Sequence, residues 1–113
     1  MSKHQKFKEA FKTLEIDIHQ TAKDKGWHNE TRTFGELIAL CHSELSEALE
    51  AYRSGNKPDE HVSQHSSIEA ELADVVIRIM DMAVLLDLDV AGAILAKSEY
   101  NKSRPHRHGG KKI

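Results

Sequence analysis

The chain has 113 residues, enough for one domain and too few for two. Its net charge of −2 gives no basis for non-specific binding to nucleic acid or to an anionic membrane. Aromatic residues make up only 5% of the chain, while helix-forming Ala, Leu, Glu and Lys are plentiful, so the composition favours helices over strands.

The cysteine content and the N-terminal segment indicate where in the cell the protein is expected to work. Cys41 is the one cysteine and stands in an apolar run, which excludes an intrachain disulfide and predicts a buried, inert thiol. The first residues are polar, without the apolar stretch of a signal peptide or a membrane span. We therefore expect a cytoplasmic protein with neither a nucleic-acid nor a membrane partner.

The first predicted helix covers about 3–25. Apolar side chains recur there at spacings of three and four residues, which is the pattern of an amphipathic helix. Gly26 follows as the expected end of this helix. The apolar stripe consists of Phe7, Phe11, Leu14, Ile18 and Ala22.

The second predicted helix begins after Thr33. Thr33 and Glu36 have the spacing of a capping box, in which each side chain binds the backbone N–H of the other residue. The helix should continue to about Arg53 and be followed by a polar loop over 55–66.

Two further helices follow the loop. Ser66 and Glu69 form a second possible capping box, which predicts a helix that continues to about residue 86. Asp89 is the expected N-cap of a fourth helix, which should end by Arg104 because Pro105 disfavours helical geometry in the residue before it. The sequence thus predicts an all-α domain over 1–104, a four-helix bundle, followed by a basic tail over 105–113.

The second helix carries acidic residues where its pattern calls for apolar ones. Glu44 falls inside the apolar arc of the helical wheel, and Glu47 lies at the edge of this arc, one turn further on. An ionised carboxylate that faces a core is costly unless a positive group meets it. Glu44 and Glu47 are therefore candidates for a functional role.

The third helix repeats this anomaly. Over 75–86 it is apolar on almost every side, which is typical of a buried helix. Glu71, Asp74, Arg78 and Asp81 nevertheless share one stripe of its surface. We expect the two acidic pairs to face each other, and Arg78 is a candidate ion-pair partner for Asp74 or Asp81.

A cluster of four carboxylates predicts a hard divalent cation. Mg²⁺ takes oxygen ligands from carboxylates, water and substrate phosphates, and Mn²⁺ accepts similar ones. A di-iron site in a helical bundle would need Glu-x-x-His, which this chain lacks. The alternative is a set of solvated surface carboxylates.

These residues resemble a known family. Glu44-Leu45-Ser46-Glu47 and Glu71-Leu72-Ala73-Asp74 are similar to the ExxE and ExxD motifs of the MazG-like all-α nucleoside triphosphate pyrophosphohydrolases. The flanking segments GWHNETRTFGELIALCHSELSEALEAYRSG and KSEYNKSRPHRHGGKK resemble the small single-domain members, so the likeness extends over almost all of 26–112.

The resemblance implies an activity and a set of ligands. Members hydrolyse a nucleoside triphosphate between the α and β phosphates, which yields a monophosphate and pyrophosphate. The metal ligands implied here are Glu44, Glu47, Glu71 and Asp74. We interpret Glu47, at the edge of the apolar arc, as the carboxylate that assists the attacking water.

Basic residues near the end of the fourth helix are the expected phosphate ligands. Lys97, Asn101 and Arg104 are spaced along one helical face, and the resemblance implies that Lys97 and Asn101 face the substrate. The alternative is a solvated face favoured by the helix dipole.

Aromatic and imidazole side chains leave more than one interpretation open. Trp27 and Phe34 either stack on a nucleobase or cover the end of the bundle, and we take Trp27 as a substrate-binding candidate. The histidines, among them His28 and His42, are interpreted as ordinary polar residues, because no spacing resembles a zinc site.

The apolar third helix also predicts assembly. One short chain supplies too few neighbours to cover it, so we expect a homodimer or homotetramer that completes the bundle. Small members of the family also form such assemblies, with sites near subunit boundaries. The main alternative to an enzyme is a non-catalytic helical module that binds nucleotide or metal and mediates assembly.

Overall fold

A computed structural model describes residues 1–104 and is helical, as the sequence predicts. Each helix begins and ends within about two residues of the bounds predicted from the sequence. None of the described helices is both long enough and apolar enough to cross a membrane. The tail predicted over 105–113 lies outside the described residues. The helices are α1 (Lys3–Asp24), α2 (Phe34–Arg53), α3 (Ser67–Leu85) and α4 (Val90–Ser103).

Capping boxes fix the start of the two central helices. The Thr33 hydroxyl accepts a hydrogen bond from the Glu36 N–H at 3.1 Å, and the Glu36 carboxylate accepts one from the Thr33 N–H at 2.9 Å. Ser66 and Glu69 form the same pair of bonds at the start of α3, and α1 begins with a third such box. Both predicted boxes are therefore confirmed.

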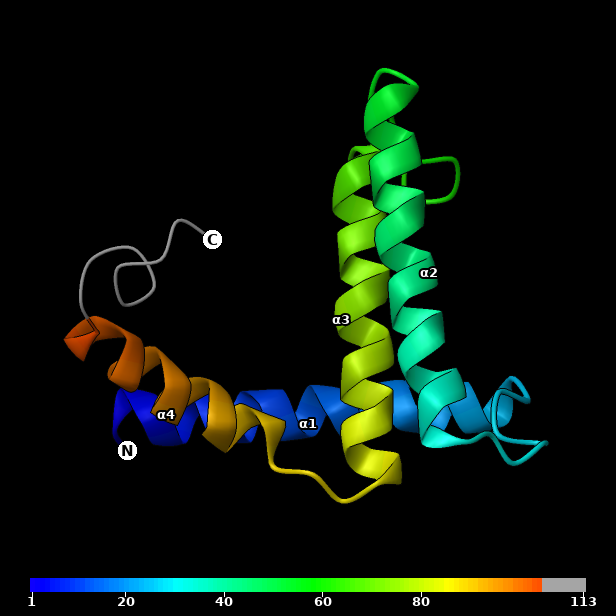
Figure 1. Cartoon of the computed structure of the whole chain (residues 1–113). Helices are drawn as coiled ribbons and strands as arrows, with labels where there is room; N and C mark the ends of the chain where they lie inside the picture. The colour runs from blue at the N-terminus through cyan, green and yellow to red at the C-terminus, as the bar shows by residue number, and fades with distance from the viewer. Residues whose placement is uncertain (105–113) are drawn as a thin grey trace.

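Two of the helices form a hairpin, and a third helix crosses it. Helices α2 and α3 run antiparallel side by side, α1 crosses beneath their ends and packs on α3, and α4 packs on α1 (Figure 1). The radius of gyration is 16.4 Å, compared with about 13 Å for a compact domain of this length. The single chain therefore does not form a closed four-helix bundle, and completion by a second chain stays a prediction.

The apolar core is small, and its central cluster lies between α2 and α3. Leu37, Cys41 and Met82 form its central cluster. Burial raises the pKa of the Cys41 thiol, which therefore stays protonated, in agreement with the expected inert cysteine. The remaining buried apolar residues are Ala22, Ala48, Met80, Ala83 and Ala91.

Much apolar surface on the hairpin stays exposed. The expectation that α3 is buried on every side is not met within one chain: Val76 is 50% exposed and Leu72 is 46% exposed. The reason is geometric, because α1 reaches only the C-terminal half of α3 and α4 turns away (Figure 1). Helix α2 exposes a comparable stripe formed by Leu45, Leu49 and Tyr52.

Candidate functional site

Three of the four predicted metal ligands come together between α2 and α3. Glu44 on α2 and both Glu71 and Asp74 on α3 offer carboxylate oxygens that all lie within 4.8 Å of one another. The antiparallel pairing of the two helices brings these motifs to the same level. We call Glu44, Glu71 and Asp74 the acidic group.

Arg78 meets the acidic group from one turn further along α3. Its Nε donates a hydrogen bond of 2.9 Å to Oε1 of Glu44, and both side chains are partly buried. Arg78 therefore pairs with Glu44 rather than with Asp74 or Asp81, although its charge also acts on Asp74. The side chain reaches across to α2 because Glu44 projects toward α3, where it would otherwise be a buried and unpaired charge.

The other two carboxylates of the acidic group repel one another. Partial burial, followed by the charges of Asp74, Glu44 and Glu47, raises the pKa of Glu71. Partial burial and the charge of Glu44 also raise the pKa of Asp74, against the opposing charge of Arg78. Their ionised forms are thus less stable than in water, which is the electrostatic condition that a bound cation relieves.

Two further carboxylates lie at the margin of the acidic group. Glu47 is exposed and lies outside it, although its charge acts on Glu71. Asp59, in the loop between α2 and α3, acts on both Glu71 and Asp74 and was not predicted. The backbone N–H groups of Val62 and His61 bind Asp59 and lower its pKa, so it is held as an anion.

The predicted phosphate ligands lie elsewhere in the chain. Lys97, Asn101 and Arg104 are exposed on α4, which packs on α1 and turns away from the hairpin (Figure 1). The charged ends of Lys97 and Arg104 lie 5.3 and 5.8 Å from the centre of the Tyr100 ring. Within one chain, the structure does not bring these residues to the acidic group.

A cavity of about 250 Å³ lies beside the acidic group. Arg78 connects the acidic group with this cavity. Its guanidinium pairs with Glu44 and also lies 4.9 Å from the centre of the Trp27 ring. Trp27 is 36% exposed and lines the cavity together with the cationic Lys25 and Arg32. Phe34 is 59% exposed and lies outside the lining.

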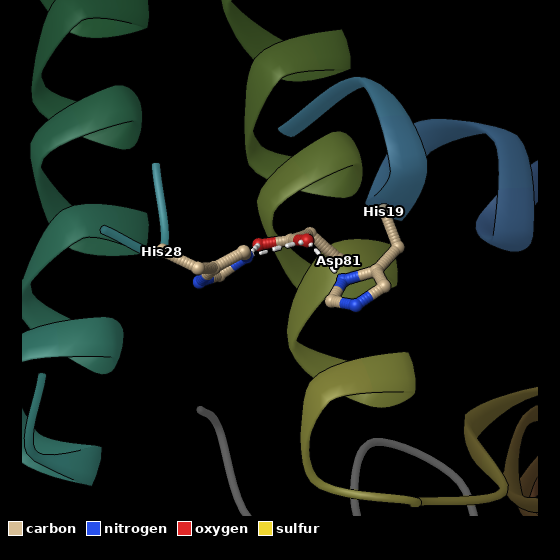
Figure 2. A group of neighbouring side chains, drawn as sticks. All are labelled: His19, His28 and Asp81. Carbon is tan, nitrogen blue, oxygen red and sulfur yellow. Dashed lines mark hydrogen bonds and ion pairs between the residues drawn. The ribbon is translucent and has the colours of Figure 1, made fainter. Parts of the chain in front are cut away.

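A second cluster, which we call the His–Asp group, was not predicted. His19 on α1 and His28 in the α1–α2 connection approach the carboxylate of Asp81 on α3 from two sides (Figure 2). His19 Nδ1 lies 2.7 Å from Oδ1, and His28 Nε2 lies 2.9 Å from Oδ2. Asp81 could have indicated this cluster from the sequence, because a carboxylate on a mostly apolar helix needs a hydrogen-bond or ion-pair partner.

The comparisons with known proteins add no relative. The chain matches no model of a protein family, no curated protein and no solved structure. The likeness to the MazG-like enzymes therefore rests on the motifs quoted above.

Proposed function

We propose that the protein is a Mg²⁺-dependent hydrolase that converts nucleoside or deoxynucleoside triphosphates to the monophosphate and pyrophosphate. The observation that carries the proposal is the acidic group, with its three convergent carboxylates and the adjoining arginine. Removal of unwanted nucleotides from the cellular pool would suit such an activity.

The residues present fit a hard divalent cation. The acidic group offers only oxygen ligands, and the raised pKa values of Glu71 and Asp74 reflect partial burial and neighbouring negative charge that the described residues do not balance. Glu44, Glu71 and Asp74 would hold Mg²⁺ or Mn²⁺, and the fourth predicted ligand, Glu47, lies outside this group but close enough for its charge to act on Glu71. When bound, the ion neutralises phosphate charge and lowers the pKa of a coordinated water.

Side chains around the acidic group supply the other functions. Glu47 is exposed beside Glu71, so it is free to accept a proton from the attacking water. Arg78 offers a guanidinium to phosphate oxygens at the border between the acidic group and the cavity. Trp27, in the lining of that cavity, offers a ring face to the base.

The remaining phosphate ligands would come from a second copy of the chain. Lys97, Asn101 and Arg104 do not reach the acidic group of their own chain, and the hairpin leaves an apolar stripe exposed on each helix. Pairing of two chains would cover such surface, which is characteristic of an interface. We infer a homodimer, or a tetramer built from dimers, in which each site combines α2 and α3 of one chain with α4 of another.

The alternative function is a non-catalytic module that binds nucleotide or metal and mediates assembly. The separation of Lys97 and Arg104 from the acidic group within one chain favours this alternative. It predicts the same apolar pairing without turnover.

A product analysis separates the two functions. The full-length protein is incubated with Mg²⁺ and each of the common ribo- and deoxynucleoside triphosphates, and the products are separated by anion exchange. We expect monophosphate and pyrophosphate in equal amounts. Diphosphate with inorganic phosphate would mean that a different bond is cleaved, and no turnover with Mg²⁺ or Mn²⁺ would favour the non-catalytic module.

A mixing experiment tests whether the site is shared between chains. Glu71→Gln should remove turnover, and Lys97→Ala should raise KM more than it lowers kcat. If each site uses α4 of the partner, a heterodimer of the two variants contains one site without either substitution. Refolding an equal mixture should then restore roughly a quarter of the wild-type activity at low substrate concentration. Sites formed within one chain would give no such recovery.

A further inference from the structure

The His–Asp group gathers its three side chains from three separate segments. His19 belongs to α1, His28 to the connection after α1, and Asp81 to α3 (Figure 2). The Asp81 side chain is 6% exposed, and those of His19 and His28 are 17% and 18% exposed. A carboxylate this deeply buried, with an imidazole on each side, is not a solvated surface feature.

The spacing of the two imidazole rings suits a single shared ion. Their centroids lie 5.3 Å apart with the planes tilted by 40°. Two imidazoles on one tetrahedral zinc, each with a Zn–N bond of about 2.0–2.1 Å, would have centroids roughly 5 Å apart. The nitrogens of His19 and His28 and the carboxylate oxygen of Asp81 already lie within 4.8 Å of one another.

Only a small adjustment separates this arrangement from metal coordination. The present nitrogen–oxygen distances of 2.7 and 2.9 Å are those of hydrogen bonds. The ligand atoms of a tetrahedral zinc site lie roughly 3.3 Å apart, so each imidazole would move away from Asp81 by about half an ångström. His28 lies in a connection rather than in a helix, which allows this movement.

We propose that His19, His28 and Asp81 form a binding site for a late first-row divalent cation of the Zn²⁺ class, separate from the acidic group. Two imidazoles and one carboxylate are a donor set that suits Zn, Cu, Fe or Ni, whereas oxygen donors alone suit Mg²⁺. Each histidine would bind as the neutral imidazole with its remaining hydrogen on the other ring nitrogen.

The site has room for a fourth, exchangeable ligand. His28 and Asp81 line the cavity of about 250 Å³ described above, so one side of the ion would face this space. Three protein ligands plus a water is the usual arrangement of an open zinc site. Lys25, Arg32 and Arg78 line the same cavity, and these cations would favour an anion at the open position.

Metal binding in the absence of nucleotide is the direct test, and it is independent of the proposed hydrolase. The metal-free, full-length protein is titrated with Zn²⁺ by calorimetry in millimolar Mg²⁺, which competes for the carboxylate oxygens of the acidic group. Co²⁺ serves as a spectroscopic probe, because a four-coordinate ion gives intense visible absorption. We expect one Zn²⁺ per chain, a raised melting temperature, and the four-coordinate Co²⁺ spectrum.

Substitutions of single histidines test which residues bind the metal ion. His28→Gln alters the connection and should leave the helices folded, and His19→Gln is the second variant. Each should weaken Zn²⁺ binding by more than about tenfold, the loss that even the outer-shell partners of a metal site produce. The matched controls are His42→Gln, at an exposed position on α2, and a double His106→Gln/His108→Gln variant, and both should bind Zn²⁺ like the wild type. Failure of the wild type to bind Zn²⁺, unchanged binding in His28→Gln and His19→Gln, or loss of binding in either control would overturn the proposal.

Discussion

Two clusters of ionisable side chains share helix α3 and differ in how their charges are compensated. The acidic group brings together Glu44, Glu71 and Asp74, of which Glu44 forms an ion pair with Arg78, so like charges are held close to one another. The His–Asp group holds one buried carboxylate, Asp81, between two imidazoles, so both of its oxygens have hydrogen-bond partners. Asp74 and Asp81 are seven residues, or two helical turns, apart on α3.

The contrast shows that position on a helix does not determine the energetic role of a carboxylate. Asp74 is partly buried and repelled by neighbouring carboxylates, and among the described residues the charge of Arg78 offsets this only in part. Asp81 accepts hydrogen bonds that its neighbours would otherwise lack. Neutralising the two residues should therefore change stability in opposite directions, while only the acidic group should control turnover of triphosphate.

The largest expected effect is on activity at Glu71. Glu71→Gln keeps the size of the side chain but removes a charged ligand from the acidic group, so Mg²⁺-dependent hydrolysis should fall by about 100-fold or more. The measurement is kcat/KM for the best triphosphate substrate at saturating Mg²⁺. Glu50→Gln, at an exposed position of α2, is the matched control and should change the rate less than about twofold. Equal losses in both variants would show that charge on the hairpin, rather than the acidic group, governs activity.

An intermediate effect is expected on stability at Asp81. In Asp81→Asn one carboxylate oxygen becomes an amide nitrogen, which cannot accept a hydrogen bond from either histidine. The free energy of unfolding in urea, measured without added metal, should fall by about 1–3 kcal/mol. Asp17→Asn, at an exposed position of α1, should leave it nearly unchanged. A more stable Asp81→Asn protein would contradict the assignment of Asp81 as a satisfied buried acceptor.

The smallest expected effect is at Asp74 and has the opposite sign. Because its folded-state pKa is raised, the folded protein holds its proton more tightly than the unfolded chain does. The contribution of Asp74 to wild-type stability should thus fall as the pH rises from about 4 through the raised pKa, and comparison with the variant isolates it. At pH 7 and without metal, Asp74→Asn should be more stable by no more than about 1 kcal/mol, and the gain should vanish near pH 3. Thermal melts across this range, repeated with Mg²⁺, test it: added Mg²⁺ should stabilise the wild type more than the variant.

The helices could be predicted from the sequence because their signals are local. Thr33 with Glu36 and Ser66 with Glu69 mark helix starts through bonds that span three residues. Gly26, with φ of 84°, adopts the left-handed conformation that ends α1. The packing of the helices was harder to predict from the sequence, because the orientation of α4 depends on contacts with α1 that no local pattern encodes.

The candidate site was predictable only where its residues lie on facing helices. The spacing within each motif of the hairpin indicated that Glu44, Glu71 and Asp74 could converge. The partner of Arg78 was missed because it lies on α2, 34 residues away, rather than on α3. The His–Asp group was missed for the same reason, since His19 lies 62 residues from Asp81 and no spacing rule connects them.

The small core described above has a calorimetric consequence. Four of the eight buried apolar residues are alanines, and among the described residues no large side chain is buried completely. Unfolding one chain would expose little apolar surface, and it is hydration of this surface that gives unfolding its heat capacity and urea its steep effect. A chain that unfolds alone would therefore have a flat stability curve and a broad transition. The sharpness of its denaturation would depend on how many chains lose their structure together.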